Sequence, residues 1–279
     1  MTDEALILYE TPAQGVARLV LNRPGAKNAQ NLAMLHQLDA MFDRAMRDGD
    51  IRVIVLAAAG SDFSAGHDLR HLLDSEDAAS FGGRASSGNF DAPAGEGYMA
   101  REEEAYMALC RKWRNLTKPT IAQVQGRCIA GGLMLAWICD LIIAADDAQF
   151  LDPVTAWGGN GVEYFGHPWE FGPRKAKEFL FTGDMMDAEE AWRLGMVNRV
   201  VPAAELAAYV EALATRIATR PSFALKTAKQ AVNAAVDAQG QQQALDTAFQ
   251  IHHLTHYHNR AIFDGKMVDP AVMPKMFKG

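Results

Sequence analysis

Within Val124-Gln-Gly-Arg-Cys-Ile-Ala-Gly-Gly-Leu-Met-Leu-Ala-Trp-Ile-Cys-Asp140, an apolar strand breaks at glycines and the chain restarts as an apolar helix. The first four N–H groups of a helix have no acceptor within that helix, and the helix dipole is positive at this end. A strand-to-helix join can therefore stabilise negative charge on a ligand oxygen. We place the join at Ala130-Gly131-Gly132.

Strand and helix patterns alternate upstream of this stretch. Residues 6–9 and 16–21 have the pattern of an antiparallel hairpin, and residues 51–57 have that of a buried strand. Between them, Asn31 is the predicted N-cap of a helix that carries apolar residues on one face and ends at Gly49. This alternation favours a layered α/β domain whose strands are covered on both faces.

A second glycine-containing join follows the buried strand, at Gly60-Ser-Asp-Phe-Ser-Ala-Gly-His-Asp-Leu69, and we expect a short helix from near Asp68. Residues 74–97 are rich in Ser, Gly, Ala and Asp without periodicity, which is typical of a surface loop. Such a loop is either a lid or a tolerated insertion. Residues 98–116 predict a helix, and residues 153–172 predict a loop crowded with glycine and aromatic residues.

The C-terminal part has helical patterns without strands. Helices are predicted at residues 203–219, 222–236 and 241–263. We therefore divide the chain into a core domain, residues 1–201, and a helical oligomerisation region, residues 202–279.

Composition excludes several protein classes. The chain has 279 residues, of which 49% are hydrophobic and 22% charged, and its net charge is -7, which argues against a nucleic-acid-binding surface. Three cysteines without C-x-x-C spacing indicate reduced thiols. The acidic start does not resemble a signal peptide, and Asp140 interrupts the most apolar run. We expect a cytoplasmic protein with no nucleic-acid or membrane partner.

Six motifs, in order along nearly the whole chain, resemble the enoyl-CoA hydratase/isomerase (crotonase) superfamily. They are Leu21-Asn-Arg-Pro24 with Lys27-Asn-Ala29, Phe63-Ser-Ala-Gly-His-Asp-Leu69, residues 126–140, Phe181-Thr-Gly183, Ala188-Glu-Glu-Ala191 and Leu194-Gly-Met-Val197. The resemblance implies an α/β crotonase-like spiral of β-β-α units with a helical C-terminal trimerisation region. It also implies a homo-trimer or a dimer of trimers.

The same resemblance implies how a substrate binds. The backbone N–H groups of His67 and Gly131 would form an oxyanion hole for the carbonyl oxygen of an acyl-CoA thioester as it becomes an enolate. Coenzyme A would enter as part of that substrate, and no permanently bound cofactor is expected. The residues implied to bind the substrate are Arg23, Lys27, Ala29, Ala65, Asp68, Leu69, Gly132, Pro153, Phe263 and Lys266.

The chain departs from the hydratase pattern at both catalytic glutamates. Their positions are Met134 and Val154, and neither side chain can accept a proton. We favour Asp152 and Glu163 as candidate acid/base groups, because a carboxylate among aromatic residues is desolvated and its pKa rises. The alternative is that Asp152 caps a turn and Glu163 faces solvent.

These residues leave several functions open. The nominal function is an enoyl-CoA hydratase-like lyase. The alternatives are isomerisation, decarboxylation or thioester hydrolysis that uses Glu163 or Asp152, and a non-catalytic acyl-CoA-binding protein. A thiol nucleophile at Cys128 is a further, weaker reading of Gly126-Arg-Cys-Ile-Ala130.

Four histidines, at 252, 253, 256 and 258, fall within one predicted helix. They include a pair four residues apart that could bind zinc, but no acidic or cysteine ligand lies at a suitable spacing. We therefore expect a polar interface helix and no metal site.

Overall fold

The computed structural model describes residues 5–69 and 88–272. Its main sheet has six strands in the order β1-β2-β3-β4-β6-β9, and a smaller sheet has three in the order β5-β7-β8. The pairs β1–β2 and β7–β8 are antiparallel, and the other neighbours are parallel. The strands are β1 (Ile7–Ala13), β2 (Val16–Leu21), β3 (Val53–Ala58), β4 (Thr120–Val124), β5 (Arg127–Ile129), β6 (Leu141–Ala145), β7 (Gln149–Leu151), β8 (Met186–Asp187) and β9 (Arg199–Val201).

The first helix, α1 (Leu32–Arg47), forms as its sequence predicts. The Asn31 side chain accepts a hydrogen bond from the N–H of Met34 at 3.0 Å, which satisfies one of the unpaired donors at the helix start. The buried side chains recur at helical spacing and pack into the larger core cluster. The predicted cap is confirmed, and the helix ends two residues before Gly49.

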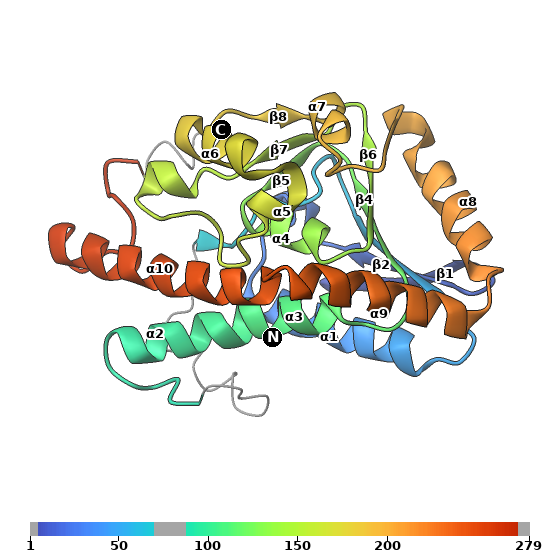
Figure 1. Cartoon of the computed structure of the whole chain (residues 1–279), viewed down its shortest axis with the longest axis horizontal. Coiled ribbons are helices and arrows are strands. Elements are labelled where there is room, and N and C mark those ends of the chain that lie inside the picture. Colours follow the sequence, from blue (N-terminus) through green and yellow to red (C-terminus); the bar gives the residue numbers. More distant parts are fainter. Residues whose placement is uncertain (1–4, 70–87, 273–279) are drawn as a thin grey trace.

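Helices cover both faces of the main sheet (Figure 1). Side chains of β2 and β3 alternate between the faces: Leu19 and Leu56 join the core cluster of α1, whereas Val55 joins a second cluster. That second cluster is completed by Leu206 and Val210 of α8 (Leu206–Ala218). Thus α8 packs on the core sheet, although it lies beyond the proposed domain boundary at residue 201.

The segment 95–114 is a continuous helix with a π-helical centre. It consists of α2 (Gly95–Glu102), the π-helical segment η4 (Glu103–Ala108) and α3 (Leu109–Arg114). The helix therefore starts earlier than predicted, within the expected loop 74–97, of which residues 74–87 lie outside the described residues. Widened turns of this kind often mark functional sites.

The long helix α10 (Gln241–Ile262) lies beside α2 and contacts α9 (Ser222–Ala238) (Figure 1). The predicted loop 153–172 also contains short helices, because Pro168 follows the first residue of α5 and presets a helical turn. The remaining helical segments are η1 (Pro24–Ala26), α4 (Gly131–Trp137), η5 (Val154–Trp157), α5 (His167–Phe171), α6 (Pro173–Thr182), α7 (Ala188–Arg193) and η6 (Ala203–Glu205). Among the described residues, no helix is both long and apolar enough to cross a membrane.

Candidate active site

The two strand-to-helix joins meet in the structure. Ser64 pairs with Cys128 in an isolated parallel bridge: the Ser64 N–H donates to Arg127 O at 3.1 Å, and the Ile129 N–H donates to Ser64 O at 2.9 Å. His67 forms a similar bridge with Gln30. The segment that carries His67 therefore runs beside the segment that leads into α4.

Two glycines allow this close approach. Gly66 has φ +90°, and a Cβ on it would lie 2.8 Å from Ile129 O and 3.1 Å from Gly131 N. A Cβ on Gly131 would lie 2.7 Å from Cε1 of the His67 ring. Glycine at both positions leaves the space that lets the segment of His67 pack against the start of α4.

The N–H groups of His67 and Gly131 are available as donors. Within residues 5–69 and 88–272, neither group donates to a protein acceptor. Ala130, directly before Gly131, has φ 46°, a conformation that a residue with a side chain rarely adopts. Such local strain is often found where the backbone is held for a functional purpose.

The His67 side chain contacts a carboxylate and an aromatic ring. Its Nε2 lies 3.0 Å from Glu163 Oε2, and its ring stacks on Tyr106 with centroids 4.0 Å apart. Tyr106 belongs to the π-helical segment η4. Glu163 is 6% exposed, so the alternative in which it faces solvent is wrong.

The pair His67–Glu163 shifts the pKa of both partners. Burial opposes the charged imidazole, but the adjacent Glu163 carboxylate outweighs burial and raises the pKa of His67. Burial likewise favours neutral Glu163, but the charge and hydrogen bond of His67 lower the pKa of that carboxyl. The predicted upward shift of Glu163 is therefore wrong, because the sequence did not reveal its partner.

Asp152 is fully buried and bound by its own loop. Oδ1 accepts from the N–H of Val154 at 3.0 Å, Oδ2 accepts from the N–H of Val162 at 2.9 Å, and Oδ2 lies 2.9 Å from His167 Nε2. The first of these bonds is the turn cap considered above. An acid/base role for Asp152 stays a prediction, and the observed contacts hold the loop that carries Glu163.

The residues at the hydratase glutamate positions are apolar and packed. Met134 is 2% exposed within the main core, and Val154 is half-buried against that core. Cys128 is completely buried, and burial raises the pKa of its thiol well above the ordinary value. A reactive thiolate at this position is therefore disfavoured.

Most residues expected along the coenzyme A path form one cluster. Arg23 Nη2 lies 3.0 Å from Asp68 Oδ2, and Arg23 Nη1 donates to Ala29 O. The Ala65 N–H donates to Lys27 O at 2.9 Å. Five residues from two distant motifs are thus brought together, as the resemblance implies.

The other expected substrate residues lie in separate parts of the structure. Leu69 is the last described residue before the gap, and Gly132 packs so closely on Ser64 that a Cβ would lie 2.7 Å from Ser64 O. Pro153 follows Asp152. Phe263 is half-buried and Lys266 exposed just after α10, and their link to coenzyme A stays a prediction.

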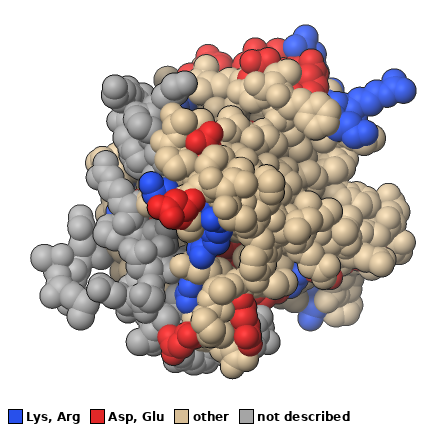
Figure 2. All heavy atoms as spheres, turned by 90° about the vertical axis from the view of Figure 1, so that its left-hand side faces the viewer, with Lys and Arg blue, Asp and Glu red and all other residues tan. Residues whose placement is uncertain are grey.

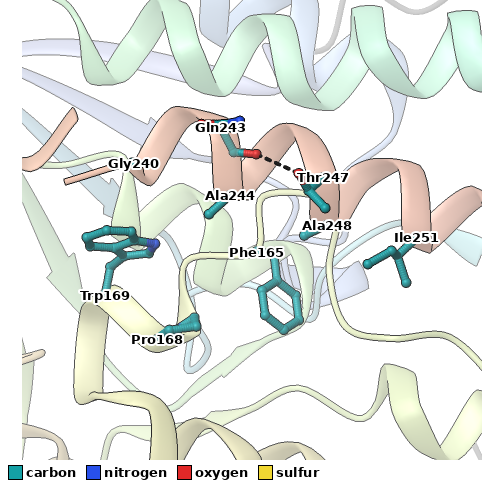
Figure 3. Close-up of a pocket in the computed structure, with 9 residues that line it drawn as sticks. All are labelled: Phe165, Pro168, Trp169, Gly240, Gln243, Ala244, Thr247, Ala248 and Ile251. Atoms are coloured by element: carbon teal, nitrogen blue, oxygen red, sulfur yellow. Dashed lines mark hydrogen bonds between the residues drawn. The ribbon is translucent and has the colours of Figure 1, made fainter. Parts of the chain in front are cut away.

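Two hollows are lined by residues other than His67 and Gly131. One, of about 460 Å³, lies between α10 and the segment 165–169, and Phe165, Pro168 and Trp169 line it on the side of that segment (Figure 3). A second, of about 680 Å³, lies against α9 and is lined by Trp137 and Glu170 among others. Both are mainly apolar and sit against the C-terminal helices.

On the face where α10 ends, acidic and basic side chains of the described residues lie among uncharged residues (Figure 2).

Sequence reasoning missed two features of this region. Tyr106 has no motif that marks it, and only the fold stacks it on His67. The histidines of α10 were expected on a polar interface, but His252 and His253 are 3% and 4% exposed and lie against buried Glu102. The i, i+4 spacing of His252 and His256 indicated that these two side chains share one helix face. Nothing in the sequence indicated that Glu102 lies beside them.

Comparisons with known proteins agree with this geometry. The profile of the family described as enoyl-CoA hydratase/isomerase matches residues 11–262. The protein named "Putative enoyl-CoA hydratase EchA13" of Mycobacterium tuberculosis is 46% identical over 266 residues, which cover 94% of this chain and 84% of that protein. Crotonyl-CoA hydratase of Syntrophomonas wolfei is 31% identical over 90% of this chain and 88% of its own length.

Solved structures resemble the fold as a whole. The crystal structure of a probable enoyl-CoA hydratase from Mycobacterium smegmatis superposes with a TM-score of 0.85 at 48% identity, covering 95% of this chain and 99% of that chain. An enoyl-CoA hydratase/isomerase from Xanthobacter autotrophicus Py2 gives a TM-score of 0.78 at 33% identity, with 90% and 87% covered. The expected crotonase-like α/β fold is confirmed. From the family profile, these relatives and the shared fold together, the chain belongs to the enoyl-CoA hydratase/isomerase (crotonase) family.

Proposed function

We propose that this protein converts acyl-CoA thioesters through an enolate, nominally as an enoyl-CoA hydratase. The observation that carries the proposal is the meeting of two glycine-rich joins, which places the segment of His67 against the start of α4 and leaves the N–H groups of His67 and Gly131 without acceptors among residues 5–69 and 88–272. Two fixed donors at one carbonyl oxygen stabilise the charge that develops on it. The loss of one such donor typically costs about 3 kcal/mol of barrier.

Glu163 is the proposed acid/base group. It is the carboxylate that contacts His67, whose own backbone supplies one of the proposed oxyanion donors. In hydration, Glu163 takes a proton from water as the water oxygen bonds to Cβ and the Cα–Cβ π electrons move into the enolate. Protonated Glu163 then gives this proton to Cα, which restores the carboxylate and the thioester carbonyl. Asp152 then acts as a positioning residue, because its carboxylate binds the N–H of Val154 and Val162 on either side of the turn.

A second candidate reaction is isomerisation of the double bond. It needs one base to remove a proton from one carbon and return it to another, with no bound water. The apolar side chains of Met134 and Val154 favour this reading, because neither can hold a nucleophilic water. Both reactions use the same oxyanion hole.

The remaining parts of the proposal concern binding and assembly. Arg23, Lys27, Ala29, Ala65 and Asp68 are the proposed contacts to coenzyme A, supported by their clustering beside His67. Copies of the chain are proposed to form a trimer or a dimer of trimers through the C-terminal helices, which carry exposed apolar side chains.

The test is turnover in D2O with short-chain, medium-chain and aromatic 2-enoyl-CoA and 3-enoyl-CoA esters, followed by mass spectrometry. Addition of water to 2-enoyl esters supports hydration. Interconversion of 2-enoyl and 3-enoyl esters with deuterium uptake supports isomerisation. Tight binding of every ester without turnover or deuterium exchange would contradict both reactions and support the binding-only alternative.

A further inference from the structure

A buried cluster of histidine and glutamate side chains lies between α2 and α10. His252 and His256 lie one turn apart on the same face of α10, and Glu102 faces them from the end of α2 (elements in Figure 1). One ligand-type atom from each of the three residues lies within 4.8 Å of the others. Glu102 is 2% exposed and His252 is 3% exposed. A concentration of polar atoms at this depth requires a partner that compensates their burial.

The distances do not match direct hydrogen bonding between these groups. His252 Nε2 lies 3.7 Å from Glu102 Oε2, and His256 Nε2 lies 3.6 Å from Glu102 Oε1. Hydrogen bonds between nitrogen and oxygen span about 2.7–3.2 Å. By contrast, ligand atoms bonded at about 2.0–2.1 Å to one tetrahedral ion lie about 3.4 Å from each other. The spacings of His252 and His256 from Glu102 are therefore closer to those of ligands around one ion than to those of hydrogen-bonded pairs.

The protonation of His252 is fixed from the other side of its ring. Nδ1 lies 2.9 Å from Gly161 O, and a carbonyl can only accept, so Nδ1 carries the hydrogen. The Nε2 lone pair then points into the cluster, where it has no hydrogen-bond partner among the described residues. Metal-binding histidines have this arrangement, because a carbonyl bonded to the outer nitrogen orients the inner one toward the ion.

Glu102 shows the complementary feature. Its Oε2 is buried without a hydrogen-bond partner in the described part of the chain, although His253 Nε2 lies 3.1 Å away. A desolvated carboxylate oxygen of this kind is costly unless a cation neutralises it. Two imidazoles and one carboxylate form a donor set suited to a divalent first-row transition metal such as Zn²⁺, Fe²⁺ or Co²⁺.

The geometry points to a divalent transition-metal site formed by Glu102, His252 and His256, with open coordination positions. The site adjoins the proposed acid/base group, because Glu163 Oε1 lies 3.7 Å from His252 Nε2 while Glu163 Oε2 contacts His67. The Glu163 carboxylate lies between an ion held there and His67, a residue of the proposed oxyanion hole. This inference concerns binding of the ion and does not depend on which reaction the protein catalyses.

The test uses the full-length protein without a histidine tag. After treatment with a chelator and dialysis, Zn²⁺ is titrated calorimetrically, and Co²⁺ binding is followed by its visible d–d absorption. We expect one ion per chain for the wild-type protein. Glu102→Gln, His252→Gln and His256→Gln should each weaken binding by about 100-fold or more, because loss of an outer-shell partner alone typically costs about 10–100-fold. His258→Gln is the matched control, because His258 is exposed on the same helix.

A second variant guards against loss of binding through misfolding. His256→Cys replaces one ligand by a thiolate, so its Co²⁺ complex should gain a sulfur-to-cobalt charge-transfer band in the near ultraviolet. The control His258→Cys should show none. The inference is overturned if the wild-type chain binds no stoichiometric Zn²⁺ or Co²⁺. It is equally overturned if folded Glu102→Gln and His252→Gln bind as the wild type does, or if His256→Cys takes up cobalt without the new band.

Discussion

The ionisation and orientation of the Glu163 carboxylate depend directly on His67. Its Oε2 lies 3.0 Å from His67 Nε2, in a site where both side chains are nearly closed to water. The imidazole orients the carboxylate and lowers its pKa, so Glu163 is held in the charged form that a general base requires.

Glu163→Gln should abolish proton transfer without closing the binding site. We expect kcat to fall by about 10²–10⁴-fold, the usual contribution of a general acid or base, with the Kd of a saturated acyl-CoA changed much less. The measurement combines steady-state turnover with calorimetric binding. Glu189→Gln, on the exposed surface of α7, is the control and should keep wild-type kcat. A Glu163→Gln protein with undiminished turnover would remove Glu163 from the mechanism.

Glu170 should make stability depend on pH. Burial raises the pKa of its carboxyl to about 8, and Arg114 offsets only part of that effect. Because the folded chain binds this proton more tightly than the unfolded chain, the free energy of unfolding falls as pH rises from about 4.5 to 8, then levels off. Glu170 is partly exposed, so the loss stays below the full ~1.4 kcal/mol per pH unit.

The variant Glu170→Gln lacks this ionisation. The difference in free energy of unfolding, Glu170→Gln minus wild type, should rise by about 1–3 kcal/mol from pH 5 to pH 9. Urea denaturation at the two pH values measures the difference. Exposed Glu178→Gln should show a much smaller pH-dependent change. If the free energy of unfolding of Glu170→Gln minus that of the wild type falls between pH 5 and pH 9, a raised pKa at Glu170 is contradicted.

At the scale of elements, the start of α4 is the part that must fit most closely. Gly131 begins the helix, and the His67 ring occupies the space where a side chain would stand. The helix start and the segment 63–68 can therefore approach only with glycine at this position.

Gly131→Ala should displace the His67 segment and spoil the oxyanion geometry. We expect kcat to fall by about 10²–10³-fold, as for removal of one oxyanion donor, while far-ultraviolet circular dichroism stays close to that of the wild type. Gly49→Ala is the matched control, because an added Cβ there meets nothing within 4 Å. Equal turnover by Gly131→Ala and the wild type would exclude this backbone as the anion site.

For the whole molecule, the C-terminal helices leave apolar side chains exposed. Phe223 of α9 is 75% exposed, and Leu254 and Tyr257 of α10 are 66% and 52% exposed. The open hollow beside Ile251 lies on the same helix (Figure 3). Apolar exposure of this extent is typical of a surface that other copies cover.

Assembly should therefore depend on α10. Size-exclusion chromatography with light scattering should give three or six times the 30.5 kDa chain mass for the wild type. The double variant Ile251→Asp with Leu254→Asp should shift the mass toward a single chain, because buried charges destabilise an apolar interface. Tyr209→Ser on α8 should leave the mass unchanged. A wild-type monomer, or an unchanged mass for the double variant, would contradict an interface on α10.

Local features were predictable where adjacent residues decide them. Asn31 was predicted as an N-cap and accepts the expected hydrogen bond, because capping involves residues only three apart. The π-helical segment at residues 103–108 was not predicted, because helical periodicity does not distinguish a single widened turn. The pKa of Glu163 was predicted in the wrong direction, because its shift comes from His67, far away in the sequence.

The sequence alone determined the crotonase-like α/β fold, the two glycine-rich joins and the absence of both hydratase glutamates. The α/β class and the joins follow from the patterns of strands, helices and glycines, whereas the crotonase-like fold and the glutamate positions follow from the resemblance of the six motifs to the family. Only the tertiary structure decided that His67 binds Glu163, and that Glu102 reaches the histidines of α10. Packing sets such partners and their protonation, because burial and distance, not spacing along the chain, govern how strongly charged groups interact.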